Sequence, residues 1–150
     1  MYKRQSKGNG RKPALNLYAK YGNSKRHINF LGHTDVVANL NNWKIPPFKG
    51  LVRKGYLNGR GSQDMKGGIA CFISSISTFI KHRKFKGSIS IIIAADEETT
   101  GFGTPAVIKY LKKRREKIDF SIVAEPSSNK SVGDEIRIGR RGSMLSLIHI

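Results

Sequence analysis

Residues 88–98 read SISIIIAADEE. The first part of this stretch is a near-continuous run of isoleucine and small residues, which is typical of a strand covered on both faces of a sheet. The run ends in three consecutive acidic residues, Asp96, Glu97 and Glu98. Because ligands bind beyond the carboxyl ends of the strands in open α/β sheets, the stretch predicts a central strand and one side of a binding site.

Strand and helix patterns alternate on both sides of this stretch, which predicts an α/β sheet. The spacing of apolar residues predicts helices over 65–81 and 104–113, the second of them capped by Thr104. Strands are predicted over 14–21, 27–31, 88–95 and 120–124, with a hairpin within 51–57, and the strand over 120–124 is expected to be buried.

The composition indicates that this chain is part of a globular protein. A chain of 150 residues with 38% hydrophobic residues suits a globular segment. It contains no run near the roughly 18 to 20 apolar residues that a membrane span needs and no apolar N-terminal block typical of a secretory signal, so a cytoplasmic location is expected. The single cysteine, Cys71, cannot form an internal disulfide and is expected to be a buried thiol.

The formal net charge of +18 would by itself favour a polyanionic partner. The basic residues are scattered along the chain, however, and the densest run, residues 112–115, ends a predicted helix, where cations complement the helix dipole. A solvated basic surface is therefore the favoured interpretation. A basic, non-catalytic polyanion-binding module is the alternative from a different functional class.

Acidic or imidazole side chains follow three of the predicted strands. His33 and Asp35 follow the strand over 27–31, and Glu125 follows the strand over 120–124. Asp64 lies in a glycine-rich turn before the longer helix. A single acidic residue at such a place is more often a turn former or a helix cap, but a series of them predicts a cluster. One imidazole with several carboxylates suits zinc, cobalt or manganese.

Two short spacings add detail to this predicted metal site. Asp35 stands two residues after His33, so its carboxylate can accept the second ring N–H of the histidine and fix its tautomer. Glu97 is adjacent to Glu98, which allows one carboxylate to hold a metal ion while its neighbour transfers protons.

Five motifs carry these residues: GHTDVV (32–37), NGRGSQDMKGG (58–68), DEE (96–98), AEPSS (124–128) and IGRRGS (138–143). Their order and spacing resemble those of the two-zinc metallopeptidase family of aminoacylases, acetylornithine deacetylases and succinyl-diaminopimelate desuccinylases. The resemblance implies an incomplete catalytic domain of the zinc-peptidase type, an α/β fold with a mixed sheet and helices on both faces.

The resemblance also implies a role for each matching residue. His33 and Glu125 would bind one zinc ion, Glu98 would bind the other, and Asp64 would bridge both and precede a cis peptide bond. Glu97 would be the general base, and Asp35 would orient His33. Arg140, with Arg141 beside it, would bind a substrate carboxylate through its guanidinium group. A surface basic pair is the alternative for the two arginines.

The segments EPSS, VGD and GRRGS look most like the desuccinylase members of the family. This likeness implies hydrolysis of N-succinyl-LL-diaminopimelate to succinate and LL-diaminopimelate, a step of lysine biosynthesis, by a homodimer. A histidine for the second zinc and a dimerisation domain would lie outside the chain. A sibling activity on acetylornithine, another acylamino acid or a dipeptide is the nearest alternative.

The two ends of the chain look foreign to this domain. The codons GTG TAT AAG AGA CAG would encode residues 1–5, and CTG TCT CTT ATA CAC ATC would encode residues 145–150. The second string begins with the reverse complement of the first, and both resemble the mosaic-end adapter of transposase-based sequencing libraries. Residues 6–144 are therefore expected to be the genuine insert, and His149 is not counted as a metal ligand.

Overall fold

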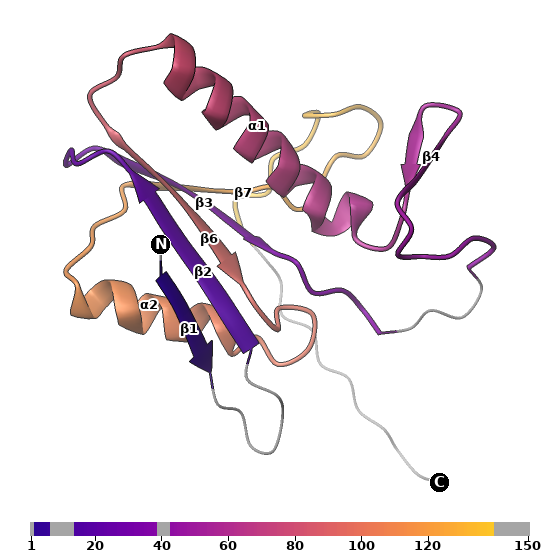
Figure 1. Ribbon diagram of the computed structural model, residues 1–150, viewed down its shortest axis with the longest axis horizontal. Coiled ribbons are helices and arrows are strands. Elements are labelled where there is room, and N and C mark those ends of the chain that lie inside the picture. The colour runs from indigo at the N-terminus through magenta and orange to yellow at the C-terminus, as the bar shows by residue number, and fades with distance from the viewer. Residues whose placement is uncertain (1, 7–13, 39–42, 140–150) are drawn as a thin grey trace, which may run out of the picture.

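A computed structural model of the chain describes residues 2–6, 14–38 and 43–139. The chain forms a five-stranded sheet with one helix on each face and a small hairpin beside it (Figure 1). In sheet order the strands are β1 (Tyr2–Ser6), β2 (Ala14–Tyr21), β6 (Ser88–Ala94), β3 (His27–His33) and β7 (Phe120–Val123). The helices are α1 (Gly67–His82) and α2 (Gly103–Lys113), and the hairpin is β4 (Leu51–Arg53) with β5 (Tyr56–Asn58).

Strand directions make the sheet mixed, as predicted. β3 pairs in parallel with both β6 and β7, whereas β2 pairs antiparallel with β6 and β1 pairs antiparallel with β2. Residues 2–5 of β1 belong to the terminal segment that was expected to be foreign to the domain, whereas Ser6 belongs to the expected insert. Since β3, β6 and β7 run in one direction, their carboxyl ends meet at one edge of the sheet.

Each face of the sheet has its own apolar core, because alternate residues of a strand point to opposite faces. Beneath α1, Phe30 and Met65 are buried and the ring of Phe30 stacks on Phe72 with centroids 4.5 Å apart. Beneath α2, the buried cluster consists of Tyr18, Ile92, Val107 and Leu111. The two cores hold β3 and β6 rigidly in the middle of the sheet.

Three local predictions were wrong. The strand β7 is exposed along its whole length, with Phe120 73% accessible, because it is an edge strand that pairs with β3 alone among the described strands. Helix α2 begins at Gly103 with no side-chain cap, so Thr104 lies inside its first turn. Cys71 is exposed, because it lies on the side of α1 that faces away from the sheet core.

Helix α1 also starts later than predicted. A distorted turn, η1 (Ser62–Lys66), precedes it, and Asp64 and Met65 leave helical backbone angles there. The peptide bond between Asp64 and Met65 is cis, as the resemblance implied. No helix in the described ranges has the length and apolarity that a membrane span requires.

The buried ring of Phe30 offers a test of this core. We expect Phe30→Ala to lower the free energy of unfolding by about 3–5 kcal/mol, because it removes a buried ring and leaves a cavity. Val132→Ala is the control, since Val132 is fully exposed, and its effect should stay within about 0.5 kcal/mol. Urea unfolding followed by circular dichroism measures both, and equal effects would contradict the assigned core.

Candidate metal centre

The centre of the site is His33, the last residue of β3. Its side chain is buried, and its Nδ1 atom lies 3.1 Å from the main-chain carbonyl oxygen of Asp35. The carboxylate of Asp35 was predicted to be this acceptor, but its Oδ1 atom is farther away, at 3.6 Å. Asp35 therefore contacts the His33 ring mainly through its backbone carbonyl group, and its Oδ2 atom accepts the main-chain N–H of Glu98 at 2.9 Å.

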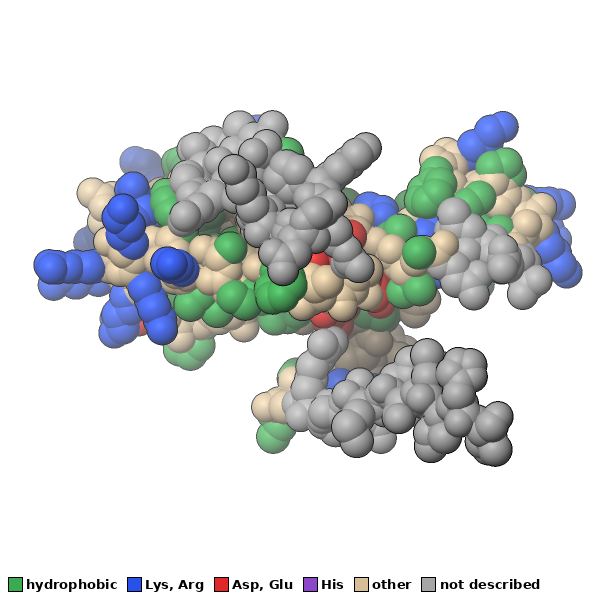
Figure 2. Space-filling model, turned by 90° about the horizontal axis from the view of Figure 1, so that it is seen from below, with side chains coloured by type: hydrophobic (Ala, Val, Ile, Leu, Met, Phe, Trp, Pro, Cys, Tyr) green, Lys and Arg blue, Asp and Glu red, His purple; other side chains and the backbone are tan. Residues whose placement is uncertain are grey.

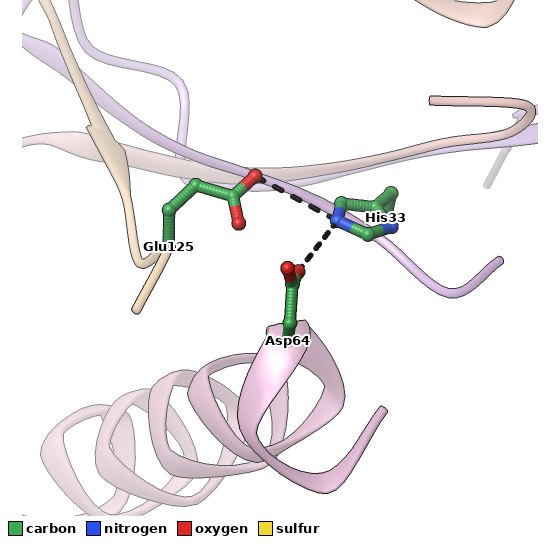
Figure 3. A group of neighbouring side chains, drawn as sticks. All are labelled: His33, Asp64 and Glu125. Carbon is green, nitrogen blue, oxygen red and sulfur yellow. Dashed lines mark hydrogen bonds and ion pairs between the residues drawn. The ribbon is translucent and has the colours of Figure 1, made fainter. Parts of the chain in front are cut away.

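Carboxylates from three other segments face the Nε2 atom of His33. Asp64 Oδ1 lies 3.1 Å away, Glu125 Oε1 3.6 Å and Glu97 Oε2 3.8 Å. Figure 3 shows Asp64, at the turn before α1, and Glu125, just after β7, pointing at the ring from two sides. The sequence analysis predicted this convergence, which brings together residues more than 90 positions apart.

Both ring nitrogens of His33 face oxygen atoms. Nδ1 faces the carbonyl oxygen of Asp35, and Nε2 faces Asp64 Oδ1, each at 3.1 Å, whereas a neutral ring carries a proton on only one nitrogen. The three carboxylates beside Nε2 also repel one another unless positive charge, from a ring proton or a metal ion, lies between them. The ligand atoms of His33, Asp64 and Glu125 all lie within 4.8 Å of one another. The donor types and their spacing therefore fit a divalent metal ion.

Burial and the crowding of negative charge shift the pKa values of three side chains in the site. Burial raises the pKa of Glu125, and the neighbouring carboxylate of Asp64 raises it further. The same two causes raise the pKa of Glu98. Burial lowers the pKa of His33, but the carboxylates of Glu125 and Glu97 outweigh it, and the net shift is upward. All three shifts show that the site favours added positive charge.

The turn after β6 carries both Glu97 and Glu98. Asp96 does not join the cluster around His33 in the described contacts, because its carboxylate accepts the hydroxyl groups of Thr99 and Thr100. Its main-chain oxygen also accepts the N–H of Gly101 at 2.6 Å. The turn is therefore closed on itself, and Glu97 and Glu98 are the acidic residues that it presents to the site.

Asp64 is anchored by its neighbour Met65. The side chain of Met65 is completely buried against Phe30 and Ile69 beneath α1. Gly32, directly before His33, packs tightly here, because an added Cβ would lie 3.1 Å from Met65 Cε and 3.0 Å from Ile69 Cγ1. The apolar core thus fixes the distance between the strand that carries His33 and the turn that carries Asp64.

Charge is distributed unevenly over the surface. Figure 2 shows Lys and Arg side chains gathered toward the two ends of the visible face, with most of its Asp and Glu side chains near the middle. The acidic site therefore lies within a chain of formal net charge +18. This pattern agrees with a solvated basic surface around a local acidic centre.

Two groups of residues complete the comparison with the sequence. Arg140 and Arg141 lie outside the described residues.

The sequence analysis missed Asp134. The carboxylate of Asp134 accepts the main-chain N–H groups of Asn129, Lys130 and Ser131 and so closes the loop after Glu125. These hydrogen bonds hold the pKa of Asp134 below its usual value. The Gly–Asp pair of the VGD segment was the available sequence clue.

Known proteins are similar to this chain in sequence and fold. A succinyl-diaminopimelate desuccinylase of Pelagibacter ubique (strain HTCC1062) is 44% identical over 137 residues, which are 89% of this chain and 36% of that protein. A desuccinylase of the same name from Ehrlichia chaffeensis (strain ATCC CRL-10679 / Arkansas) is 46% identical over 141 residues, 91% of this chain and 37% of that protein. The chain thus spans little more than a third of the length of these relatives.

A solved structure has a similar fold. Human carnosine dipeptidase 1 superimposes with a TM-score of 0.63 and 26% sequence identity over 75% of this chain and 25% of that one. The model of peptidase family M20/M25/M40 matches residues 30–141, a range that includes His33, Asp64 and Glu125. Metallopeptidases of this family use divalent metal ions, in agreement with the donor set around His33. The chain belongs to peptidase family M20/M25/M40.

Proposed function

We propose that this chain is part of the catalytic domain of a two-zinc amide hydrolase. The observation that carries the proposal is the Nε2 atom of His33, which faces the carboxylates of Asp64, Glu97 and Glu125 within 3.8 Å. A cluster of this kind at the carboxyl edge of a sheet, in a family of metallopeptidases, is suited to metal-assisted hydrolysis.

The ligands divide between two metal positions. His33 and Glu125 would hold one zinc ion, Glu98 would hold the second, and Asp64 would bridge them. The raised pKa values of Glu98 and Glu125, both caused by burial and then by Asp64, support a shared site around Asp64. Cobalt or manganese could occupy the same oxygen and nitrogen donors. Bound metal ions supply positive charge that acidifies a water molecule and stabilises the carbonyl oxygen.

Glu97 is the general base in this proposal. Its carboxylate lies 3.8 Å from His33 Nε2, yet its side chain remains 33% exposed, so it reaches both the metal site and incoming water. Glu97 accepts a proton from the water molecule whose oxygen attacks the amide carbon. It then delivers that proton to the amine nitrogen as the carbon–nitrogen bond breaks. Asp35 keeps the imidazole of His33 in the tautomer that leaves Nε2 free to bind metal.

The substrate in our proposal is N-succinyl-LL-diaminopimelate, and the products are succinate and LL-diaminopimelate. The support is the extent of the two desuccinylase matches, which cover 89% and 91% of this chain. Arg140 and Arg141 would bind a substrate carboxylate, in a homodimeric cytoplasmic enzyme of lysine biosynthesis. Acetylornithine and other acylamino acids are the competing substrates.

Metal binding at His33 can be tested by substitution in the full-length protein that contains this chain. We expect His33→Ala to reduce bound zinc by about one equivalent, because it removes a nitrogen donor that the carboxylates cannot replace. His82→Ala is the matched control, since His82 is an exposed residue at the end of α1. Zinc content after dialysis measures both, and equal metal contents would refute the assignment of His33.

The role of Glu97 predicts a different result. We expect Glu97→Gln to lower kcat by about 100- to 10,000-fold, because an amide cannot accept the proton, while the zinc content stays near that of the wild type. Glu135→Gln is the control, since Glu135 is a surface residue paired with Arg137, and it should leave kcat unchanged. Steady-state kinetics measure kcat, and metal analysis measures the zinc content. Retained turnover in Glu97→Gln would show that Glu97 is not the general base.

Substrate preference separates the desuccinylase from its siblings. We expect kcat/KM of the full-length protein to be at least about tenfold higher for N-succinyl-LL-diaminopimelate than for N-acetylornithine, because one set of side chains cannot pair with both acyl groups equally. A chelator should abolish both activities, and added zinc should restore them. A preference for acetylornithine would leave the hydrolase proposal intact and overturn the substrate.

A further inference from the structure

The turn that carries Glu97 and Glu98 begins where the main-chain pairing of the sheet stops. The last Cα partners along β2 and β6 are Leu17 and Ile93. Beyond them, the side chain of Asn16 replaces the sheet ladder, because its Oδ1 atom accepts the main-chain N–H of Ala95 at 2.9 Å. Figure 1 shows the start of β2 beside the arrowhead of β6, at this edge of the sheet.

The first residue of helix α2 packs closely against Ala95 and Asn16. An added Cβ at Gly103, the first residue of α2, would lie 1.9 Å from the carbonyl oxygen of Ala95 and 2.8 Å from Asn16 Oδ1. Asn16 itself is 3% exposed. Ala95 is therefore held between a hydrogen bond from β2 and the closely packed start of α2, with no space to move toward the helix.

The position of Ala95 determines the positions of the two glutamates. Glu97 follows it by two residues and Glu98 by three, and the turn is short because Asp96 and Gly101 are hydrogen bonded across it. Within the turn, the N–H of Glu98 donates to the Asp35 carboxylate at 2.9 Å. Asn16 and Asp35 thus fix the two ends of the segment that contains the proposed base.

A polar residue at position 16 is better explained by its hydrogen bond to Ala95 than by packing in the core. Its Nδ2 atom is buried without a hydrogen-bond partner among the described residues, and a buried donor without a partner destabilises a fold. Tyr18, on the same face two residues further on, belongs to the apolar cluster beneath α2. A leucine would fill the site of Asn16 without burying a polar group, so the hydrogen bond to Ala95 is the interaction that specifically requires an oxygen acceptor here.

We propose that Asn16 is a positioning residue that sets the placement of Glu97 and Glu98 through its hydrogen bond to Ala95. The proposal rests on the proposed function, because it assigns these glutamates to proton transfer and metal binding. Asn16 touches neither the metal site nor the substrate in this proposal. It acts through the backbone of the turn.

The test uses the full-length protein loaded with Co²⁺, whose visible absorption reports ligand geometry. Asn16→Leu keeps the number and branching of the side-chain heavy atoms and removes the acceptor, Asn16→Asp keeps the acceptor, and Val107→Ala loosens the same apolar core without touching the turn. We expect Asn16→Leu to lower kcat about 10- to 100-fold, with KM changed by less than about twofold and the Co²⁺ spectrum altered. Asn16→Asp should recover most of the lost kcat and the wild-type spectrum.

The controls make each outcome decisive. If Asn16→Leu does not fold, Asn16→Ala removes the same acceptor and takes its place. The proposal is overturned if the acceptor-free variant has the kcat and spectrum of Val107→Ala, or if Asn16→Asp is as slow as Asn16→Leu. A wild-type protein that binds Co²⁺ but hydrolyses no acylamino acid would instead refute the proposed function, and a changed spectrum in Asn16→Leu would still support the positioning role.

Discussion

Mutual repulsion between the carboxylates gathered around His33 Nε2 is the constraint that organises this structure. Asp64, Glu97 and Glu125 come within 3.8 Å of that nitrogen from separate segments of the chain. Isolated carboxylates would separate in water, so the fold has to hold them together. The two apolar cores and the buried hydrogen bonds at the strand ends provide the rigidity for this.

The fold meets the constraint by building the site on rigid elements. The parallel strands β3, β6 and β7 bring their carboxyl ends to one edge of the sheet, and the buried side chain of Met65 fixes the neighbouring turn. A polar network within the sheet runs from His27 through Ser90 and Asn29, with distances of 2.8 Å at both steps, and holds β3 to β6. Sites supported in this way keep their geometry better than sites on loops alone.

Much of this arrangement could be predicted from sequence, because its signals are local. The apolar runs predicted the strands, and the acidic residues after them predicted a cluster that the structure forms around His33. The errors concern the exposure of a strand, which depends on strand order, and the local path of the backbone. The exposure of Phe120 follows from the place of β7 at the edge of the sheet, and the acceptor for His33 Nδ1 follows from how the backbone turns at Asp35. The spacing of residues in the sequence determines neither the order of strands in the sheet nor the direction in which the backbone turns.

The open side of β7 has a consequence for handling this polypeptide in isolation. Within residues 2–6, 14–38 and 43–139 no strand pairs with this side of β7, and an open edge with apolar side chains such as Phe120, Ile122 and Val123 is a template for strand addition from another molecule. Neither a proline nor a charged side chain interrupts the four residues of the strand. Self-association through this edge would grow with protein concentration, and a lysine placed at an outward position of β7 is the natural means of suppressing aggregation.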